Sequence, residues 1–376
     1  MGKYGKKNEV DLNPIHYNIA ILGESGIGKT TLAKEICEKL VGEDGYLHLD
    51  IGKEDGASAI QGIVSEPVED WNKLKDVVED IVENKTTDYP DLQTVIWDTY
   101  DELIIMAEKE AIRQYNRKNP DKKADTINGA WGGFGKGQDK AVELILDQIW
   151  ELKKVGVNSI IVAHVKRSDI TDPISQETYS KLTADTQQRY FNAIKNKMHF
   201  IGLAYVDRDI VKEKTGKKNV VTKEEVVINR VVSESRVISF RDDTYSVDSK
   251  SRFAEIVDHI PFSSDAFIGA MQDAILAEHS KGSKTVEQTK KEQAKAQKEA
   301  DAAAAEYSKQ ARAQKIDVER NEELLAVIKE RFSDATDDAK KQVRAIMEEY
   351  GFGNFKDAEV PTAALEKIVE TLGTGA

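Results

Sequence analysis

The stretch from Gly23 to Thr31, Gly-Glu-Ser-Gly-Ile-Gly-Lys-Thr-Thr, fits the phosphate-binding pattern G-x-x-x-x-G-K-[ST] without a mismatch. An apolar run at residues 19–22 leads into it, and apolar residues at helical spacing follow it. This order predicts a strand, a loop and a helix, which is the context in which the pattern binds phosphate. The sequence therefore predicts an α/β fold organised around a nucleotide site.

Each residue type in this loop has a chemical reason to be there. Glycines let the backbone curl so that consecutive N–H groups point at phosphate oxygens, and the N-terminus of the following helix adds attraction. Lys29 is expected to reach the β and γ phosphates, and the Thr30 hydroxyl is expected to hold Mg²⁺. No Asn-Lys-x-Asp motif is present, which favours ATP over GTP. The predicted cofactor-binding residues are Gly23, Glu24, Ser25, Gly26, Ile27, Gly28, Lys29, Thr30 and Thr31.

A second acidic feature follows at residues 92–98, an apolar run typical of a buried strand that ends in Asp98. A carboxylate at this place can hold the water shell of the metal opposite Thr30, so Thr30 and Asp98 are the predicted metal residues. The alternative is that Asp98 only caps the next helix, expected at residues 99–114.

Three further residues are candidates for catalysis, together with Lys29 and Asp98. Glu102, one helical turn beyond Asp98, could orient a water, although acids are common in any first turn of a helix. Glu54 lies in a glycine-rich loop after a predicted strand that carries Asp50 near its end. His164 ends the predicted strand at residues 157–165, at the sheet edge where ligands bind. The simpler interpretation of His164 is a histidine that only forms a hydrogen bond at the end of a strand.

Composition restricts the other classes of function. The net charge of −13 argues against a protein whose whole surface binds nucleic acid, so any polyanion site must be local. The single cysteine, Cys37, excludes a disulfide framework and is expected to be a core residue. No run approaches the roughly 20 apolar residues of a membrane span, and the polar start lacks a signal-peptide core, so we expect a cytoplasmic protein without a membrane partner.

Two polar segments are predicted as loops. Residues 113–138 combine cations, glycines, Trp131 and Phe134, which suits either a mobile loop that stacks bases or a surface loop with Trp131 packed back on the core. Residues 166–190 have balanced charges and are a weaker candidate for binding polyanions. Strands are then expected at 199–209, 223–233 and 235–245. Arginines in or beside these strands, Arg208, Arg230, Arg236 and Arg241, either reach the nucleotide of a neighbouring subunit or form surface ion pairs.

The chain divides into four predicted parts. Residues 1–14 are expected to be flexible, and residues 15–277 to form the core. Residues 278–317, rich in Lys, Glu, Gln and Ala, are expected to be an extended or helical linker. Residues 318–376 are expected to form a small helical domain, which is either a docking module or a solubility or oligomerisation appendage.

The chain resembles the RecA-like core ATPases encoded by phages, often described as AAA-family or phage nucleotide-binding proteins, a group that includes single-strand annealing recombinases. The resemblance covers residues 15–260 and rests on Gly23 to Thr31 and on three further runs, residues 94–98, 160–164 and 237–253. It implies a RecA-like P-loop core with a mostly parallel central sheet, antiparallel edge strands and a small C-terminal helical module.

The same resemblance implies that Asp98 is the Walker B acid, that His164 takes the sensor place and that the two polar loops occupy the places of DNA-binding loops. RecA-like enzymes commonly carry a catalytic glutamate just after the second strand, whereas here Asp50 is followed by Ile51 and Gly52. Glu54 or Asp55 is left to substitute, so we expect weak hydrolysis.

The leading hypothesis is an Mg-ATP-dependent protein that binds single-stranded DNA for annealing or strand exchange, with ATP and Mg²⁺ as cofactors. A single-strand-binding protein or another replication or recombination partner is expected to use the C-terminal module, and a homo-oligomer is expected. The rivals are a nucleotide-switched adaptor or assembly protein and a helicase-loader-like or packaging ATPase.

Overall fold

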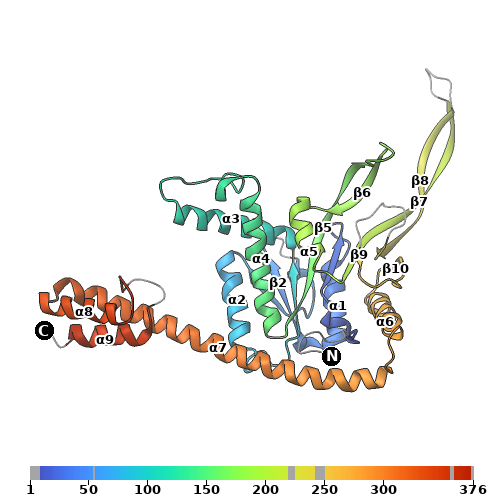
Figure 1. The fold of residues 1–376 in the computed structure, drawn as a ribbon. Helices are drawn as coiled ribbons and strands as arrows, with labels where there is room; N and C mark the ends of the chain where they lie inside the picture. The colour runs from blue at the N-terminus through green and yellow to red at the C-terminus, as the bar shows by residue number, and fades with distance from the viewer. Residues whose placement is uncertain (1–8, 54–55, 219–224, 242–249, 356–359, 374–376) are drawn as a thin grey trace. The chain divides into compact units, whose positions relative to one another are not determined.

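The computed structural model describes residues 9–53, 56–218, 225–241, 250–355 and 360–373 (Figure 1). Contacts between residues divide the chain into two compact units, residues 1–304 and residues 305–376. Each unit has its own apolar core. The predicted boundaries at residues 277 and 317 stay predictions.

Among the described residues, a ten-stranded sheet forms the centre of the first unit. Eight of its strands follow the order β10-β8-β7-β1-β5-β4-β2-β3, and in addition β6 pairs with β5 and β9 pairs with β7. Neighbours from β7 to β3 run parallel, and β6, β8, β9 and β10 pair antiparallel. The predicted α/β fold class, with a mostly parallel central sheet and antiparallel edge strands, is therefore confirmed. The strands are β1 (Ile19–Gly23), β2 (Tyr46–Ile51), β3 (Ser65–Val68), β4 (Thr94–Asp98), β5 (Asn158–Thr171), β6 (Thr178–Ala184), β7 (Phe200–Lys218), β8 (Glu225–Ser239), β9 (Lys250–Ser251) and β10 (His259–Pro261).

Helices cover both faces of the parallel strands (Figure 1). The first helix, α1, packs against α6, and α2, α3 and α4 pack against one another. Because both faces are covered, β1 is buried along its whole length, which explains its continuous apolar sequence. The helices are α1 (Lys29–Val41), α2 (Trp71–Asn84), α3 (Tyr100–Lys118), α4 (Lys136–Lys154), α5 (Gln188–Lys195), α6 (Ser264–Ser280), α7 (Val286–Asp334), α8 (Asp337–Glu349) and α9 (Thr362–Gly373). Short 3₁₀ turns lie at Pro14–His16, Glu43–Gly45, Ala57–Ala59 and Ala130–Gly132.

The single cysteine lies in the core of the first unit. Cys37 is fully buried on α1, and burial raises the pKa of its thiol well above the usual range. The sequence expectation of a core residue is confirmed.

Two segments differ from the sequence-based prediction. The predicted loop at residues 166–190 is a β-hairpin, because β5 continues to Thr171 and pairs with β6. Its strands carry exposed polar side chains, and two cross-strand hydroxyl pairs, Ser168–Thr183 and Thr171–Thr178, support the pairing. This polar composition is the reason that the pattern was mistaken for a loop.

The second difference concerns the three strands predicted at 199–209, 223–233 and 235–245. The structure has two, and β8 runs straight through the predicted turn between them, where Arg208 faces Glu234 across the ladder. Residues 223, 224 and 242–245 lie outside the described residues. We call the part of this hairpin beyond the parallel sheet, residues 205–218 with 225–237, the β7–β8 arm.

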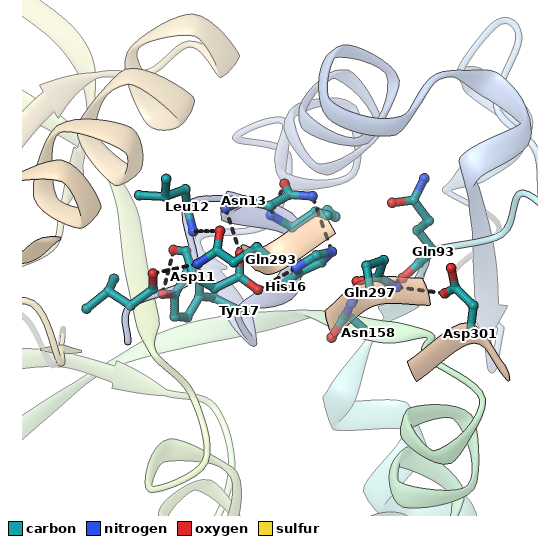
Figure 2. A network of polar contacts seen from close by, with 12 residues as sticks. Asp11, Leu12, Asn13, His16, Tyr17, Gln93, Asn158, Gln293, Gln297 and Asp301 are labelled. Atoms are coloured by element: carbon teal, nitrogen blue, oxygen red, sulfur yellow. Dashed lines mark hydrogen bonds and ion pairs between the residues drawn. The ribbon is translucent and has the colours of Figure 1, made fainter. Parts of the chain in front are cut away.

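The described residues before β1 are held by side-chain hydrogen bonds (Figure 2). The Asp11 carboxylate accepts from the backbone N–H of Asn13 and lies 2.7 Å from Nδ1 of His16. Gln293 of α7 accepts from the N–H of Leu12 and donates to the carbonyl of Val10. Residues 9–13 are thus tied to the first unit, whereas flexibility was predicted for residues 1–14.

The second unit contains the end of α7, all of α8 and all of α9. Its core is apolar and includes Ile328, Val343 and Ile368. Thr336 caps α8 by accepting a hydrogen bond from the N–H of Ala339. In the described part of the chain, no helix has both the length and the apolar character needed to cross a membrane.

The substitution Ile328→Ala is expected to destabilise the second unit by about 3 kcal/mol, because it leaves a cavity in a fully buried position. Hydrogen exchange followed by mass spectrometry on the full chain should show faster exchange in peptides from residues 318–372 and unchanged exchange in the central sheet. The control is Ile316→Ala, which lies on the same helix at an exposed position and should change little. Equal effects of the two variants would contradict an independent core.

Candidate functional site

The glycine-rich loop lies between the end of β1 and the start of α1, at the carboxyl edge of the parallel strands. Gly26 and Gly28 have positive φ angles of 76° and 106°, which residues with a Cβ atom rarely adopt. Gly23 is restricted differently, since a Cβ there would lie 3.0 Å from the carbonyl oxygen of Ala204. The glycine spacing in the motif therefore has a direct backbone reason.

Lys29 and Thr30 begin α1, and their side chains stay inside the loop. The Lys29 ammonium donates to the carbonyl of Glu24 at 3.1 Å, and the residue is buried. The Thr30 hydroxyl donates to Oδ2 of Asp98 at 2.5 Å. Glu24, Ser25, Gly26 and Thr31 are exposed at the mouth of the loop, and Ile27 is buried beneath it. The structure thus brings the two predicted metal residues into direct contact.

Asp98 has a second buried partner that the sequence interpretation missed. His48 of β2 is fully buried and its Nε2 lies 3.2 Å from Oδ2 of Asp98, while its Nδ1 lies 3.0 Å from Oγ of Ser65. An ionised carboxylate only accepts hydrogen bonds, so Nε2 carries the proton and Nδ1 accepts from Ser65. The neighbouring helix α3 begins at the N-cap Thr99, so Asp98 is not its cap. A histidine in an otherwise apolar buried strand was the available signal.

His164 lies beside the loop because β5 is the neighbour of β1, in a register that pairs His164 with Gly23. Oδ2 of Asp101 lies 2.9 Å from both the backbone nitrogen and Nδ1 of His164. This contact orients the imidazole ring. Asp101 lies in the first turn of α3, directly after β4, which ends in Asp98. The junction of β4 and α3 therefore supplies both the acid that contacts Thr30 and the acid that contacts His164.

The other predicted acids are placed differently. Glu102 lies against the end of β2, since a Cβ on Gly52 would stand 2.6 Å from Oε2 of Glu102. Asp50 pairs in register with Asp98 across β2 and β4. Glu54 and its neighbour Asp55 lie outside the described residues. The structure therefore brings Glu102 next to the segment that leads to Glu54, rather than to Thr30.

The residues present fit a magnesium ion and a triphosphate. A hydroxyl and a carboxylate are hard oxygen ligands of the kind Mg²⁺ takes. Among the described residues no cluster of three or more His, Cys, Asp or Glu side chains could hold a metal, so an ion at Thr30 and Asp98 requires water and phosphate oxygens as its other ligands. Nearby, Oδ1 of Asp101 and Oγ1 of Thr99 are buried without a hydrogen-bond partner, as expected where a polar ligand or water completes the site.

Arg236 of β8 contacts the loop of its own chain. Its Nη1 donates to the carbonyl of Ile27 at 3.1 Å, and its guanidinium lies 5.1 Å from the ring centre of Phe262. The Phe262 ring is also next to the loop, 3.5 Å from where a Cβ on Gly28 would stand. The sequence interpretation named Arg236 only as one of four arginines and did not name Phe262.

The other three arginines have different partners. Arg208 and Arg230 form ion pairs with Glu234 and Glu213 within the arm. Arg241 donates to the carbonyl of Phe253. Of the two alternatives predicted for these arginines, Arg208 and Arg230 therefore follow the simpler one, an ion pair at the surface.

The loop predicted at residues 113–138 is shorter than expected, because α3 extends to Lys118 and α4 begins at Lys136. The Trp131 indole donates to the carbonyl of Ala111 and packs beside Tyr115. Of the two alternatives for this loop, this agrees with the one in which Trp131 packs back on the core. Phe134 is different, because its side chain is fully exposed, at 101% relative accessibility.

Comparison with known proteins gives a family. A family model described as an AAA domain matches residues 15–253. No curated protein matches the chain. Among solved structures, a KaiC-like protein, PH0186, from Pyrococcus horikoshii OT3 is similar at 12% identity and a TM-score of 0.34, covering 66% of this chain and 85% of that one.

Arg236→Ala is expected to weaken nucleotide binding about tenfold, because the loop loses a charged hydrogen bond that holds one of its carbonyls. Titration with a fluorescent ATP analogue measures the affinity. Arg208→Ala removes an exposed arginine from the same hairpin and serves as the control. If both variants bind as the parent protein does, Arg236 has no part in shaping the loop.

Proposed function

Because the chain belongs to the AAA domain family of P-loop NTPases, we propose that it binds and hydrolyses ATP with Mg²⁺ at the loop between β1 and α1. The observation that carries this proposal is the contact between the Thr30 hydroxyl and the Asp98 carboxylate at 2.5 Å. These two groups come from segments 68 residues apart, and they meet beside the glycine-rich loop that precedes α1. Such a pair is what a magnesium-bound triphosphate requires.

Each side chain has a part that follows from its position. The backbone of Gly23 to Gly28 surrounds the phosphates, and Lys29 exchanges its contact with the Glu24 carbonyl for a phosphate oxygen. Thr30 and Asp98 hold the ion, which supplies charge neutralisation when bound. His48 donates to Asp98 from below and keeps the carboxylate oriented.

The group that positions the attacking water is proposed among three candidates. His164, oriented by Asp101, lies at the loop. Glu102 lies against Gly52, directly after the end of β2. A carboxylate and an imidazole can each accept a hydrogen bond from the attacking water, so all three stay candidates for that step. Hydrolysis is expected to be weak if none of them reaches the γ-phosphate.

We further propose that the protein binds single-stranded DNA near Phe134. The support is local: Phe134 is a fully exposed aromatic residue, and the exposed cations Lys122, Lys123 and Lys136 are in the same segment. Aromatic rings that stack bases beside cations that contact phosphates are the usual means of binding single strands. Annealing or strand exchange is the activity that this binding would serve.

A nucleotide-switched adaptor remains the second candidate, and the β7–β8 arm favours it. The arm exposes aliphatic side chains, Ile210, Val211 and Val232 among them. Two of its arginines are held in ion pairs with glutamates of the same arm. Such a surface suits a protein partner better than a polyanion. A partner for residues 318–376 and a homo-oligomer also stay predictions.

Asp98→Asn is expected to remove the gain in ATP affinity that magnesium provides and to lower the hydrolysis rate at least tenfold, because the ion loses its protein carboxylate. Binding of a fluorescent ATP analogue is measured with Mg²⁺ and with EDTA. The control is Asp91→Asn, an exposed aspartate just before β4, at the opposite edge of the sheet. If Asp98→Asn keeps the full magnesium dependence, the proposed metal site is wrong.

Phe134→Ala is expected to weaken binding of an oligo(dT) strand about tenfold, because it removes one stacking surface. Fluorescence anisotropy at several salt concentrations, with and without Mg-ATP, measures the affinity. Ile174→Ala, another exposed apolar residue of the first unit, is the control. Absence of oligonucleotide binding at low salt by the parent protein would favour the adaptor, while nucleotide binding would stand.

A further inference from the structure

A second cavity lies at the edge of the sheet opposite the nucleotide loop. Its volume is about 400 Å³, and its lining includes Asn18, Ser159 and His199. Asn18 directly precedes β1, Ser159 lies at the start of β5, and His199 directly precedes β7. The cavity therefore opens where these three parallel strands begin, whereas the glycine loop follows the point where β1 ends.

One wall of this cavity is apolar. It is formed by α4, from which Leu146, Ile149 and Trp150 face the space, and by Ile194 of α5. Trp150 leaves 52% of its surface exposed, which is unusual for an indole ring. A cavity of this size with such a wall has the dimensions of a small-molecule site.

The polar part of the lining combines neutral side chains with three positively charged hydrogen-bond donors. Lys153, Lys197 and Arg252 line the cavity, and its lining residues include no aspartate or glutamate. The backbone N–H of Asn18 donates to Nδ1 of His199 at 3.1 Å, so the neutral ring carries its proton on Nε2 and is a donor there. Lys153 donates to the side-chain oxygen of Asn158 and also interacts with the Asp11 carboxylate outside the lining. Three cations in one lining are nevertheless notable in a chain of net charge −13.

The walls of the cavity are held in place by contacts that do not involve a ligand. Arg252 donates through Nε to the carbonyl of Met198 at 3.2 Å and through Nη2 to the carbonyl of Asn196. The side chain of Asn18 donates to the carbonyl of Lys197 at 3.1 Å. The segment between α5 and β7 is thus fixed before any ligand arrives, which lowers the entropic cost of binding.

We propose that this cavity is a second binding site, for a small molecule with a flat apolar body and one anionic head group. The body stacks on Trp150 and contacts Ile149 and Ile194, and the head group lies among Lys153, Lys197 and Arg252. A carboxylate, sulfonate or phosphate satisfies the donors, and the positive charges exclude cationic ligands.

This site is separate from the nucleotide site. The five residues of β1 lie between Asn18 and the loop, a distance of roughly 17 Å for an extended strand. Occupation of one site therefore does not block the other sterically. A ligand that binds here is not displaced by ATP.

The test compares two probes that share an apolar body. 1-Anilinonaphthalene-8-sulfonate carries an anionic group, and N-phenyl-1-naphthylamine is its neutral analogue. Both are titrated into the full chain and followed by their fluorescence. We expect the sulfonate to bind more tightly, and we expect saturating Mg-ATP to leave its affinity unchanged.

Two variants separate the contributions of charge and stacking. Lys197→Gln should weaken the sulfonate about threefold and leave the neutral probe unchanged, because only one probe has the ionic contact. Trp150→Ala should weaken both about tenfold, because both lose the aromatic surface. Trp150 is half exposed and Lys197 lies at the rim, so the variants should keep the thermal transition of the parent protein.

The controls are close in position or in chemistry. Lys195→Gln removes a lysine two residues away that does not line the cavity, and Phe134→Ala removes an exposed aromatic residue elsewhere. Both should bind the probes as the parent protein does. Displacement by Mg-ATP, equal affinity for the two probes, or indifference to both cavity variants would each overturn the proposal.

Discussion

The contact between Thr30 and Asp98 depends on the order of the strands. Since β5 lies between β1 and β4, the strand that leads to the loop and the strand that ends in Asp98 are about 10 Å apart, which is twice the spacing of neighbouring strands. The contact forms because α1 starts directly after the loop and points Thr30 across the end of β5. His164 lies on β5 between them, in register with Gly23. The insertion of β5 therefore brings loop, acid and histidine to one place.

Buried polar groups keep this arrangement fixed. A buried carboxylate is costly unless it is hydrogen-bonded, and Asp98 meets that requirement through Thr30 and His48. The Asp101 carboxylate does the same for the backbone and ring of His164. From the other side of the loop, Arg236 bonds to Ile27. Arg236 lies at the base of the β7–β8 arm, so this hydrogen bond connects the arm to the loop.

The parts of the fold that the sequence predicted correctly are those with a strong local pattern. The apolar strands ending at Gly23 and Asp98, and the buried Cys37, follow from burial on both faces of a sheet. The hairpin of β5 and β6 was predicted as a loop, because its exposed strands have no apolar alternation. The prediction of a turn near Glu234 was wrong for a related reason, since polar residues in an exposed strand have the same composition as a turn. The role of residues 318–376 has no local pattern to indicate it.

The sequence by itself determined that a glycine loop, a lysine and a threonine would form one phosphate-binding segment, because these nine residues are adjacent in the chain and their chemistry is local. It also indicated Asp98, as an acid at the end of an apolar strand. Only the tertiary structure decided that His48 holds Asp98, that Arg236 and Phe262 flank the loop, and that Trp150 and Lys197 share a cavity. These pairs are far apart in the sequence, and they meet only because the order and register of the strands bring them together.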